Sequence, residues 1–494
     1  MSRLCLLLAA AALGCAGAGG DRGASSATAA HAASGPAREI AALVAAYHDV
    51  DQFDGVVAVV DHGRVIYRGA VGLANREWRV PHTLESRFDI ASMTKPMTAI
   101  VVLQLVDEGK LRLDAPVAEY VPAFRTAALR AITIEQLLRH RSGLQQDIAF
   151  AGDPADVSTT AAMLNADLLS LEEIVRLIAE RPLRFAPGSD YGYSSDGYAV
   201  LGAAIEHVTG HSYWDELAAR VLRPAGMTST VPAFLTPVIP HRVDGYRVTF
   251  DRIENGEHIG PTPAGGLYAP VDDLIAWERA LAGDTLMSAR SKQLVFAVRT
   301  EITAYGWKTS EIERGGKPVL VARTTGGLPG FVHVLERIPS EGRAVMALCN
   351  VRGPASHLDQ LVAGVHAILD GGIAEPPRRS VATEAAAVTG GAAAITRELE
   401  RMADAPDRYY VDEGELNRLG YHLLLVRRDP QAAIAVLGFN AVRFPSSPNV
   451  HDSLGEAYMA AGDKAAAIRS YEKVLELDPG NANATNMLER LRGN

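Results

Sequence analysis

The sequence predicts an α+β domain followed by an all-α domain of helical repeats. Two β-rich stretches, residues 55–67 and 319–348, flank a central region whose apolar residues have mostly helical spacing. A 34-residue periodicity near the C-terminus indicates the helical repeats. Strands at both ends of one domain favour a single antiparallel sheet, formed by the N- and C-terminal strands and flanked by a helical subdomain.

The composition is that of an acidic, globular, multi-domain chain. At about 150 residues per domain, 494 residues suggest about three units. The chain has 48 Lys and Arg against 58 Asp and Glu, a net charge of −10, which argues against a basic surface for nucleic acid or anionic lipid. Its three cysteines are too few for a disulfide scaffold or a four-cysteine metal site.

Residues 1–20 are predicted to be a signal peptide. Arg3 precedes ten apolar residues, 4–13, whereas a membrane-spanning helix needs about 20. The following Gly14-Cys15 resembles a bacterial lipoprotein cleavage box, in which Cys15 becomes the lipidated first residue. Cleavage by an ordinary signal peptidase in the Ala/Ser/Gly stretch after it is the alternative. We expect an exported bacterial protein, periplasmic or anchored to the membrane only through this lipid.

The first domain is expected to span residues 37–370, after a flexible tether at 21–36. Its elements begin with a helix at 39–44 and a β-hairpin at 55–67. The middle, about 90–300, has a mostly helical pattern interrupted by Gly and Pro loops.

Three apolar runs near the end of the first domain predict its later strands, at 319–321, 331–335 and 344–348. A turn at 340–342 separates the last two runs. Cys349 follows the third run and is predicted to be a buried structural thiol.

A Gly-, Pro- and Ala-rich segment, 371–395, is predicted to be a linker, and 396–494 a helical domain. Residues 448–481 match the tetratricopeptide pattern strongly, and 414–447 match it weakly. Because two repeats are fewer than an independent solenoid needs, we expect this domain to lean on the first domain or on flanking helices. Bracing of the first domain is the favoured role, and recruitment of a protein partner is the alternative.

The strongest chemical signal is Ser92-x-x-Lys95 before an apolar helical run. Residues three apart lie on one helix face, so Ser92 and Lys95 can touch. A serine hydroxyl becomes a good nucleophile when a base removes its proton, and an amine can do so only in its neutral form. The spacing alone is common, and its ordinary explanation is an N-cap serine beside a solvated lysine.

The surroundings match a known family in order and spacing. This stretch resembles the serine β-lactamase and penicillin-binding-protein-like hydrolases, most closely the branch of class C β-lactamases, D-alanyl-D-alanine carboxypeptidases and EstB-type esterases. The resemblance covers about 40–370 and implies an active site between a helical domain and an antiparallel sheet. It also implies acyl transfer through a covalent acyl-serine, with no metal or cofactor. The matching blocks are 88–95, 137–144, 185–188, 193–202, 264–267 and 326–331.

The resemblance assigns roles residue by residue. Ser92 matches the nucleophile and Lys95 its proton acceptor. Tyr193 matches the tyrosine that moves a proton between serine, leaving group and hydrolytic water, and Tyr191 is the alternative. The oxyanion hole would be formed by the backbone N–H groups of Ser92 and Gly327.

The chain departs from the family at two motifs. Ser195 stands where relatives have an asparagine that helps to hold the lysine and a substrate amide. Thr324-Thr325-Gly326 stands where relatives have a Lys or His that contacts a substrate carboxylate. Arg323 is adjacent, but neighbouring strand residues point to opposite faces, so it is not a simple replacement.

Both departures favour substrates that need little carboxylate or amide anchoring. We therefore expect a small-molecule ester or amide as substrate. One alternative is an impaired site that binds a partner or a cell-wall-type peptide without turnover. Another is a D-alanyl peptide carboxypeptidase or weak β-lactamase.

Other site types match less well. Gly192 to Asp196 nearly spells the G-x-S-x-G elbow, but Asp196 replaces the second Gly and no strand precedes it. The histidines form no H-E-x-x-H motif, so no zinc site is expected. His140 and His333 are predicted to have structural roles.

Overall fold

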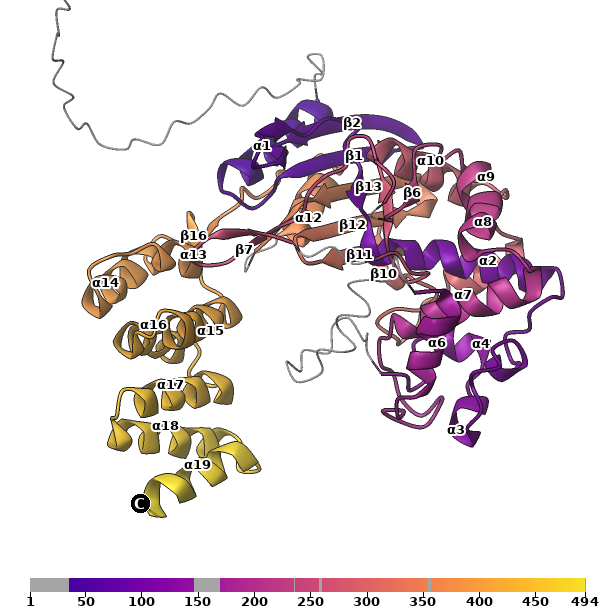
Figure 1. Ribbon diagram of the computed structural model, residues 1–494. Helices are drawn as coiled ribbons and strands as arrows, with labels where there is room; N and C mark the ends of the chain where they lie inside the picture. Colours follow the sequence, from indigo (N-terminus) through magenta and orange to yellow (C-terminus); the bar gives the residue numbers. More distant parts are fainter. Residues whose placement is uncertain (1–34, 146–168, 235, 257–259, 354–356, 494) are drawn as a thin grey trace, which may run out of the picture.

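The computed structural model describes residues 35–145, 169–234, 236–256, 260–353 and 357–493 (Figure 1). The predicted signal peptide, Cys15 and nearly all of the predicted tether lie outside the described residues. Within the described part of the chain, no helix combines the length and apolar character needed to cross a membrane.

A six-stranded antiparallel sheet forms the centre of the first domain, in the order β10-β11-β12-β13-β1-β2. The predicted union of N- and C-terminal strands is confirmed, because β1 pairs with β13 along its length. Of these six strands only β10 was not predicted; it is a mostly exposed, polar edge strand. The strands are β1 (Gly55–Asp61), β2 (Arg64–Val71), β10 (Lys308–Arg314), β11 (Lys317–Leu328), β12 (Phe331–Ile338) and β13 (Arg343–Cys349).

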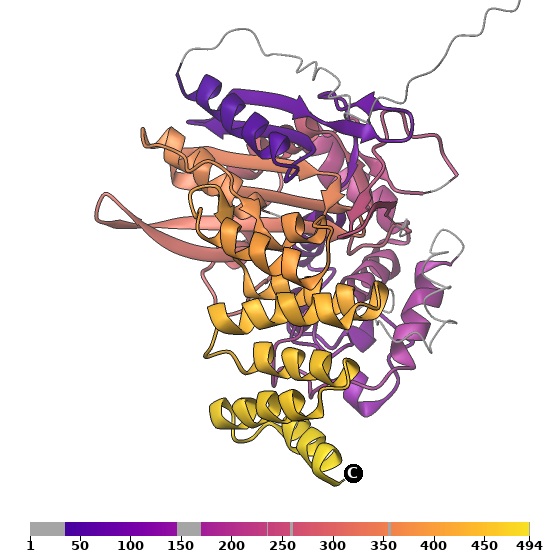
Figure 2. The same cartoon turned by 90° about the vertical axis from the view of Figure 1, so that its left-hand side faces the viewer.

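Helices cover both faces of this sheet (Figures 1 and 2). On one face, α1 (Pro36–Asp49) packs on β2 and on α12 (Leu358–Leu369), which in turn contacts β12 and β13. On the other face, α10 (Val271–Ala282) contacts β1 and β13. Because both faces are covered, β1 is buried along nearly its whole length.

The predicted helical subdomain is built around α2 (Lys95–Asp107), in which ten residues are buried. Helices α7 and α8 pack against α2. A small sheet, β5-β9-β6, connects this subdomain to the central sheet. The remaining helical elements here are η1 (Ala91–Thr94), η2 (Val117–Glu119), α3 (Ala127–Arg130), α4 (Ile134–Leu138), α6 (Leu171–Ala179), α7 (Asp196–Thr209), α8 (Tyr213–Leu217), η5 (Ala218–Leu222), α9 (Arg223–Ala225) and α11 (Ala289–Val295).

Short strands complete the first domain. The β7–β8 hairpin extends away from the central sheet and pairs with β14 through β7. These strands are β3 (Leu73–Asn75), β4 (Val80–Pro81), β5 (Phe88–Asp89), β6 (Val231–Pro232), β7 (Tyr246–Val248), β8 (Ile253–Asn255), β9 (Leu267–Ala269) and β14 (Val351–Arg352).

The prediction of a linker over 371–395 is wrong for its central part. Residues 371–378 have no regular secondary structure and are mostly exposed, but β15 (Arg379–Ser380) pairs with β16 (Tyr409–Tyr410). Helix α13 (Val381–Ala386) then packs into the core of the C-terminal domain. Its alanines resemble linker composition, but their small side chains allow close contact with α14 and α15.

The C-terminal domain is a stack of helices, in which α14 packs on α16 and each helix from α15 to α18 packs on the next (Figure 1). Both predicted repeats form helix pairs, and helices α14 and α19 flank them as expected. The helices are α14 (Ala392–Ala403), α15 (Glu413–Tyr421) continued by η7 (His422–Val426), α16 (Pro430–Arg443), α17 (Pro448–Ala460), α18 (Lys464–Leu477) and α19 (Ala482–Gly493).

The tip of the β7–β8 hairpin contacts the C-terminal domain. Phe250 packs against the core of the repeats and its ring lies 5.5 Å from that of His422. Asp251 accepts hydrogen bonds from His422 at 2.6 Å and from Arg427 Nε at 2.7 Å. These hydrogen bonds, chiefly that from Arg427, hold the pKa of Asp251 below its usual value. The repeats therefore lean on the first domain, as their small number predicted.

Candidate active site

A strained turn presents Ser92 at the start of α2. Strand β5 ends at Asp89, and Ala91 adopts a left-handed φ of 52°. The Asp89 carboxylate accepts the Ala91 N–H at 3.0 Å and so stabilises this turn. Buried His333 donates to the Asp89 carbonyl oxygen at 2.8 Å and ties β12 to the same segment. The structural role predicted for His333 agrees with this contact.

Lys95 is buried beside Ser92, with 1% of its surface exposed. Its Nζ lies 2.9 Å from Ser92 Oγ, 3.0 Å from Ser195 Oγ and 2.9 Å from the Ala264 carbonyl oxygen. These three acceptors match the three donors of a lysine ammonium. Ser195, which replaces the asparagine of relatives, therefore still contacts the lysine.

Tyr193 completes the contacts to the predicted nucleophile. Its hydroxyl donates to Ser92 Oγ at 2.9 Å, and Lys95 Nζ lies 4.9 Å from the centre of its ring. Tyr191 instead hydrogen-bonds with Thr303. The structure thus brings together Ser92, Lys95 and Tyr193, and directs the alternative tyrosine elsewhere.

The ring of His140 packs against the ring of Tyr193. The two rings are stacked with their centres 4.4 Å apart, and His140 Nδ1 accepts the Ser194 N–H at 3.2 Å. Burial, and to a smaller degree the charge of Lys95, lower the pKa of His140 to about 3, so its ring is neutral. The structural role predicted for His140 therefore includes positioning of Tyr193.

The Tyr193→Phe variant is expected to lower kcat for ester hydrolysis about 10²-fold or more. Phenylalanine keeps the ring packing on His140 but removes the hydroxyl that reaches Ser92 and could transfer a proton. Steady-state kinetics with a p-nitrophenyl ester provide the measurement. Tyr191→Phe is the matched control and should change kcat less than twofold; the opposite ranking would assign the proton transfer to Tyr191.

Strand β11 forms the opposite wall of the site. Thr324 and Thr325 line a cavity of about 290 Å³ together with Ser92, Lys95 and Tyr193. A Cβ atom on Gly326 would lie 2.3 Å from the Ile90 carbonyl oxygen, so β11 passes directly beside the segment that leads to Ser92. Gly327 follows on this strand, and its role in an oxyanion hole stays a prediction.

Two cations in this cavity were not predicted as site residues. Arg323 pairs with Glu336 at 3.4 Å and with Asp359, so its charge is already balanced by carboxylates. Lys308 lies opposite Arg323 in the β10–β11 register and lines the same cavity. Among the described residues, Lys308 has no ion-pair partner. It is therefore an available positive charge in the cavity that contains Ser92.

A serine that accepts hydrogen bonds from a buried lysine and a tyrosine hydroxyl has the arrangement of an acyl-transfer serine hydrolase. Comparison with known proteins agrees. The Beta-lactamase family model matches residues 40–367, and the chain belongs to this family of serine hydrolases. The Tetratricopeptide repeat model matches residues 448–481, the stronger of the two predicted repeats.

Curated relatives include an esterase and a penicillin-binding protein. Esterase EstB of Burkholderia gladioli is 40% identical over 179 residues, which cover 35% of this chain and 45% of the esterase. Penicillin-binding protein 4* of Bacillus subtilis is 25% identical over 390 residues, which cover 71% of this chain and 83% of that protein. The chain thus aligns with less than half of the esterase's own length.

Solved structures show the same fold for the first domain. A penicillin-binding protein from Bacillus halodurans superposes with a TM-score of 0.58 and 24% identity, covering 66% of this chain and 98% of that one. A D-amino acid amidase from Ochrobactrum anthropi superposes with a TM-score of 0.58 and 21% identity, covering 68% and 99%. The likeness to these structures is one of fold.

Proposed function

We propose that the protein is an exported serine hydrolase that cleaves esters or small amides through an acyl-serine intermediate. The observation that carries this proposal is the placement of Lys95 Nζ and the Tyr193 hydroxyl at 2.9 Å each from Ser92 Oγ. Export is inferred from the pattern of residues 1–20.

The proposed reaction has two halves. Lys95 takes the Ser92 proton, a step that requires its deprotonated amine, while Oγ attacks the substrate carbonyl carbon, and the oxyanion is held by the N–H groups of Ser92 and Gly327. The proton passes through the Tyr193 hydroxyl to the leaving group as its bond to the acyl carbon breaks. A water molecule then gives a proton to the same groups and attacks the acyl carbon. The bond from that carbon to Ser92 Oγ breaks, Oγ takes the proton back, and the acid is released.

Esters are the favoured substrates for two reasons. Their alcohol leaving group departs more easily than an amine. Ester cleavage therefore needs less help from the two motifs that are altered here, at Ser195 and at 324–326. The hydroxyl of Ser195 already accepts a hydrogen bond from Lys95 Nζ, so it is poorly placed to serve as a dedicated hydrogen-bond partner for a substrate amide. The aligned part of Esterase EstB supports the same choice.

Covalent labelling tests the proposal directly. The protein is treated with a fluorophosphonate probe, digested, and its modified peptide is identified by mass spectrometry. Turnover of p-nitrophenyl esters, D-alanyl peptides and a chromogenic cephalosporin is measured in parallel. Labelling at Ser92 with faster turnover of esters supports the proposal. A folded protein that is neither labelled nor active would contradict it and favour a binding protein instead.

Lys308 is expected to favour substrates that carry a carboxylate on the leaving group. Lys308→Ala should raise KM for m-carboxyphenyl acetate up to about fivefold and leave KM for phenyl acetate unchanged, because an exposed ion pair contributes about 1 kcal/mol or less. Release of each phenol is followed at low and high salt. Lys317→Ala, at the far end of the same hairpin, is the matched control. An equal change for both esters would contradict a charge interaction.

A further inference from the structure

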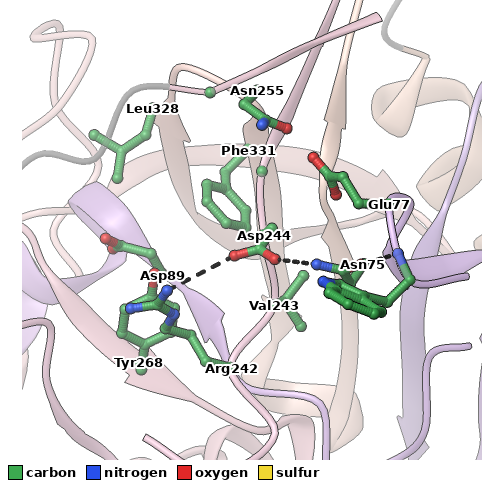
Figure 3. Close-up of a pocket in the computed structure, with 13 residues that line it drawn as sticks. Asn75, Glu77, Asp89, Arg242, Val243, Asp244, Asn255, Tyr268, Leu328 and Phe331 are labelled. Atoms are coloured by element: carbon green, nitrogen blue, oxygen red, sulfur yellow. Dashed lines mark hydrogen bonds and ion pairs between the residues drawn. The ribbon is translucent and has the colours of Figure 1, made fainter. Parts of the chain in front are cut away.

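A second cavity, of about 320 Å³, is lined by a set of residues different from that of the active site (Figure 3). Two of its lining residues are close in the chain to the proposed reaction centre. Asp89 precedes Ser92 by three residues, and Leu328 directly follows Gly327. Because three residues span at most about 11 Å, the Asp89 backbone lies within that distance of Ser92.

The cavity has more negative than positive groups. Glu77, Asp89 and Asp244 line it, and Arg242 is the one cation among its described lining residues. Arg242 lies 3.9 Å from Asp244, which also accepts a hydrogen bond from Asn75 at 2.7 Å (Figure 3). Among the described residues, Glu77 and Asp89 have no ion-pair partner. The lining therefore has a net negative charge.

Two further cations lie near the lining without belonging to it. Arg76 pairs with Asp54 at 2.5 Å, so its charge is balanced outside the cavity. Arg352 donates to the Leu328 carbonyl oxygen at 3.2 Å, a contact that leaves its positive charge in place beside Leu328.

Asp89 has the features of a carboxylate that lacks a counter-charge. It is 2% exposed, and its side chain accepts the Ala91 N–H. Burial raises the pKa of Asp89 to about 7, because the charged form loses hydration without gaining a cation. A positively charged group in the cavity would favour the ionised form of Asp89.

Glu77 and an aromatic residue face the open side of the same cavity. Tyr246 donates to the Glu77 carboxylate at 2.5 Å and holds its pKa below the usual value, so Glu77 is ionised at neutral pH. The neighbouring Trp78 is 83% exposed, which is unusual for the largest apolar side chain. The face of an indole ring attracts cations.

We propose that this cavity binds an ammonium group carried on the acyl part of the substrate. The inference rests on the proposed function and adds a substrate class to it. An ammonium offers three donors, which the Glu77 and Asp89 carboxylates can accept beside their existing hydrogen bonds, and it can approach the Trp78 ring. An anionic group would be repelled. No three described His, Cys, Asp or Glu side chains are grouped as metal ligands, so an organic cation fits the lining better than a metal ion.

Two isosteric esters test the proposal. p-Nitrophenyl 6-aminohexanoate carries the ammonium, and p-nitrophenyl heptanoate has a methyl group in its place. The wild-type protein should show a higher kcat/KM for the ammonium ester. The variant Glu77→Gln should reduce that preference about fivefold, because an exposed ion pair contributes about 1 kcal/mol or less, and should change heptanoate hydrolysis little. Asp89 is left in place in this comparison, because its carboxylate holds the turn that presents Ser92.

A control variant and a binding measurement distinguish failure of the ammonium site from failure of the proposed hydrolase function. Glu85→Gln removes an exposed carboxylate outside the cavity and should preserve the preference. Binding of hexylammonium chloride to the Ser92→Ala protein is measured by calorimetry, with and without the Glu77→Gln and Asp89→Asn substitutions. Binding that requires both carboxylates supports the cavity site even when neither ester is hydrolysed. Ester turnover without charge preference, or equal binding with and without the substitutions, would overturn the cavity site alone.

Discussion

Ser92→Ala is expected to abolish fluorophosphonate labelling and to lower kcat for ester hydrolysis at least about 10⁴-fold. Alanine removes the hydroxyl that accepts hydrogen bonds from Lys95 and Tyr193 and leaves the surrounding backbone intact. Loss of a catalytic serine in unrelated serine hydrolases reduces kcat by about 10⁶-fold, so residual activity should reflect binding and the oxyanion hole alone. Initial rates with p-nitrophenyl acetate at saturating substrate provide the measurement.

The control for this variant is Ser189→Ala. Ser189 is an exposed loop serine whose hydroxyl donates to the Ala186 carbonyl oxygen. Its loss should leave labelling and turnover within twofold of the wild type. Turnover that survives in Ser92→Ala and disappears with another serine would move the nucleophile away from Ser92.

Lys95→Met is expected to lower kcat about 10³-fold while the Ser92 hydroxyl remains in place. Methionine fills a similar volume but cannot take a proton, so serine attack loses its base. The rate of fluorophosphonate labelling measures the acylation step directly and should fall in parallel. Labelling at the wild-type rate would show that another group, with Tyr193 as the nearest candidate, activates Ser92.

Stability must be followed in the same experiment, because Lys95 is also a structural donor. Its amine bonds the Ala264 carbonyl oxygen, which would lose this buried partner. The melting temperature of Lys95→Met shows whether this variant is still folded at the temperature of the assay. Lys110→Met, an exposed change at the end of α2, is the matched control for the substitution itself.

The union of the terminal strands could be predicted because both strand groups have strong local signals. The runs at 55–60 and 344–348 are apolar and short, and they form β1 and β13. Strand β10 has no such signal, since it is a polar edge strand whose pairing with β11 depends on the tertiary structure. The helix at 381–386 was missed because alanine-rich sequence is common to linkers and to tightly packed helices.

The sequence predicted those residues of the candidate site that belong to short motifs. Ser92 and Lys95 share one helix turn, and the spacing of the surrounding blocks pointed to Tyr193. Tyr193 was preferred to Tyr191 from the motif spacing, and the hydrogen bond from its hydroxyl to Ser92 supports that choice. Lys308 could not be foreseen, because the sequence separates it from every motif and only the β10–β11 register brings it to the cavity.

The β7–β8 hairpin gives the two domains a basis for thermodynamic coupling. Asn255 and Gly256, near its base, line the second cavity, while Phe250 and Asp251 at its tip contact the repeats. A protein that binds the repeats and displaces this tip would act on the cavity through the paired strands of the hairpin. Linkage makes such an effect reciprocal: occupation of the cavity would change the affinity for that protein by the same factor.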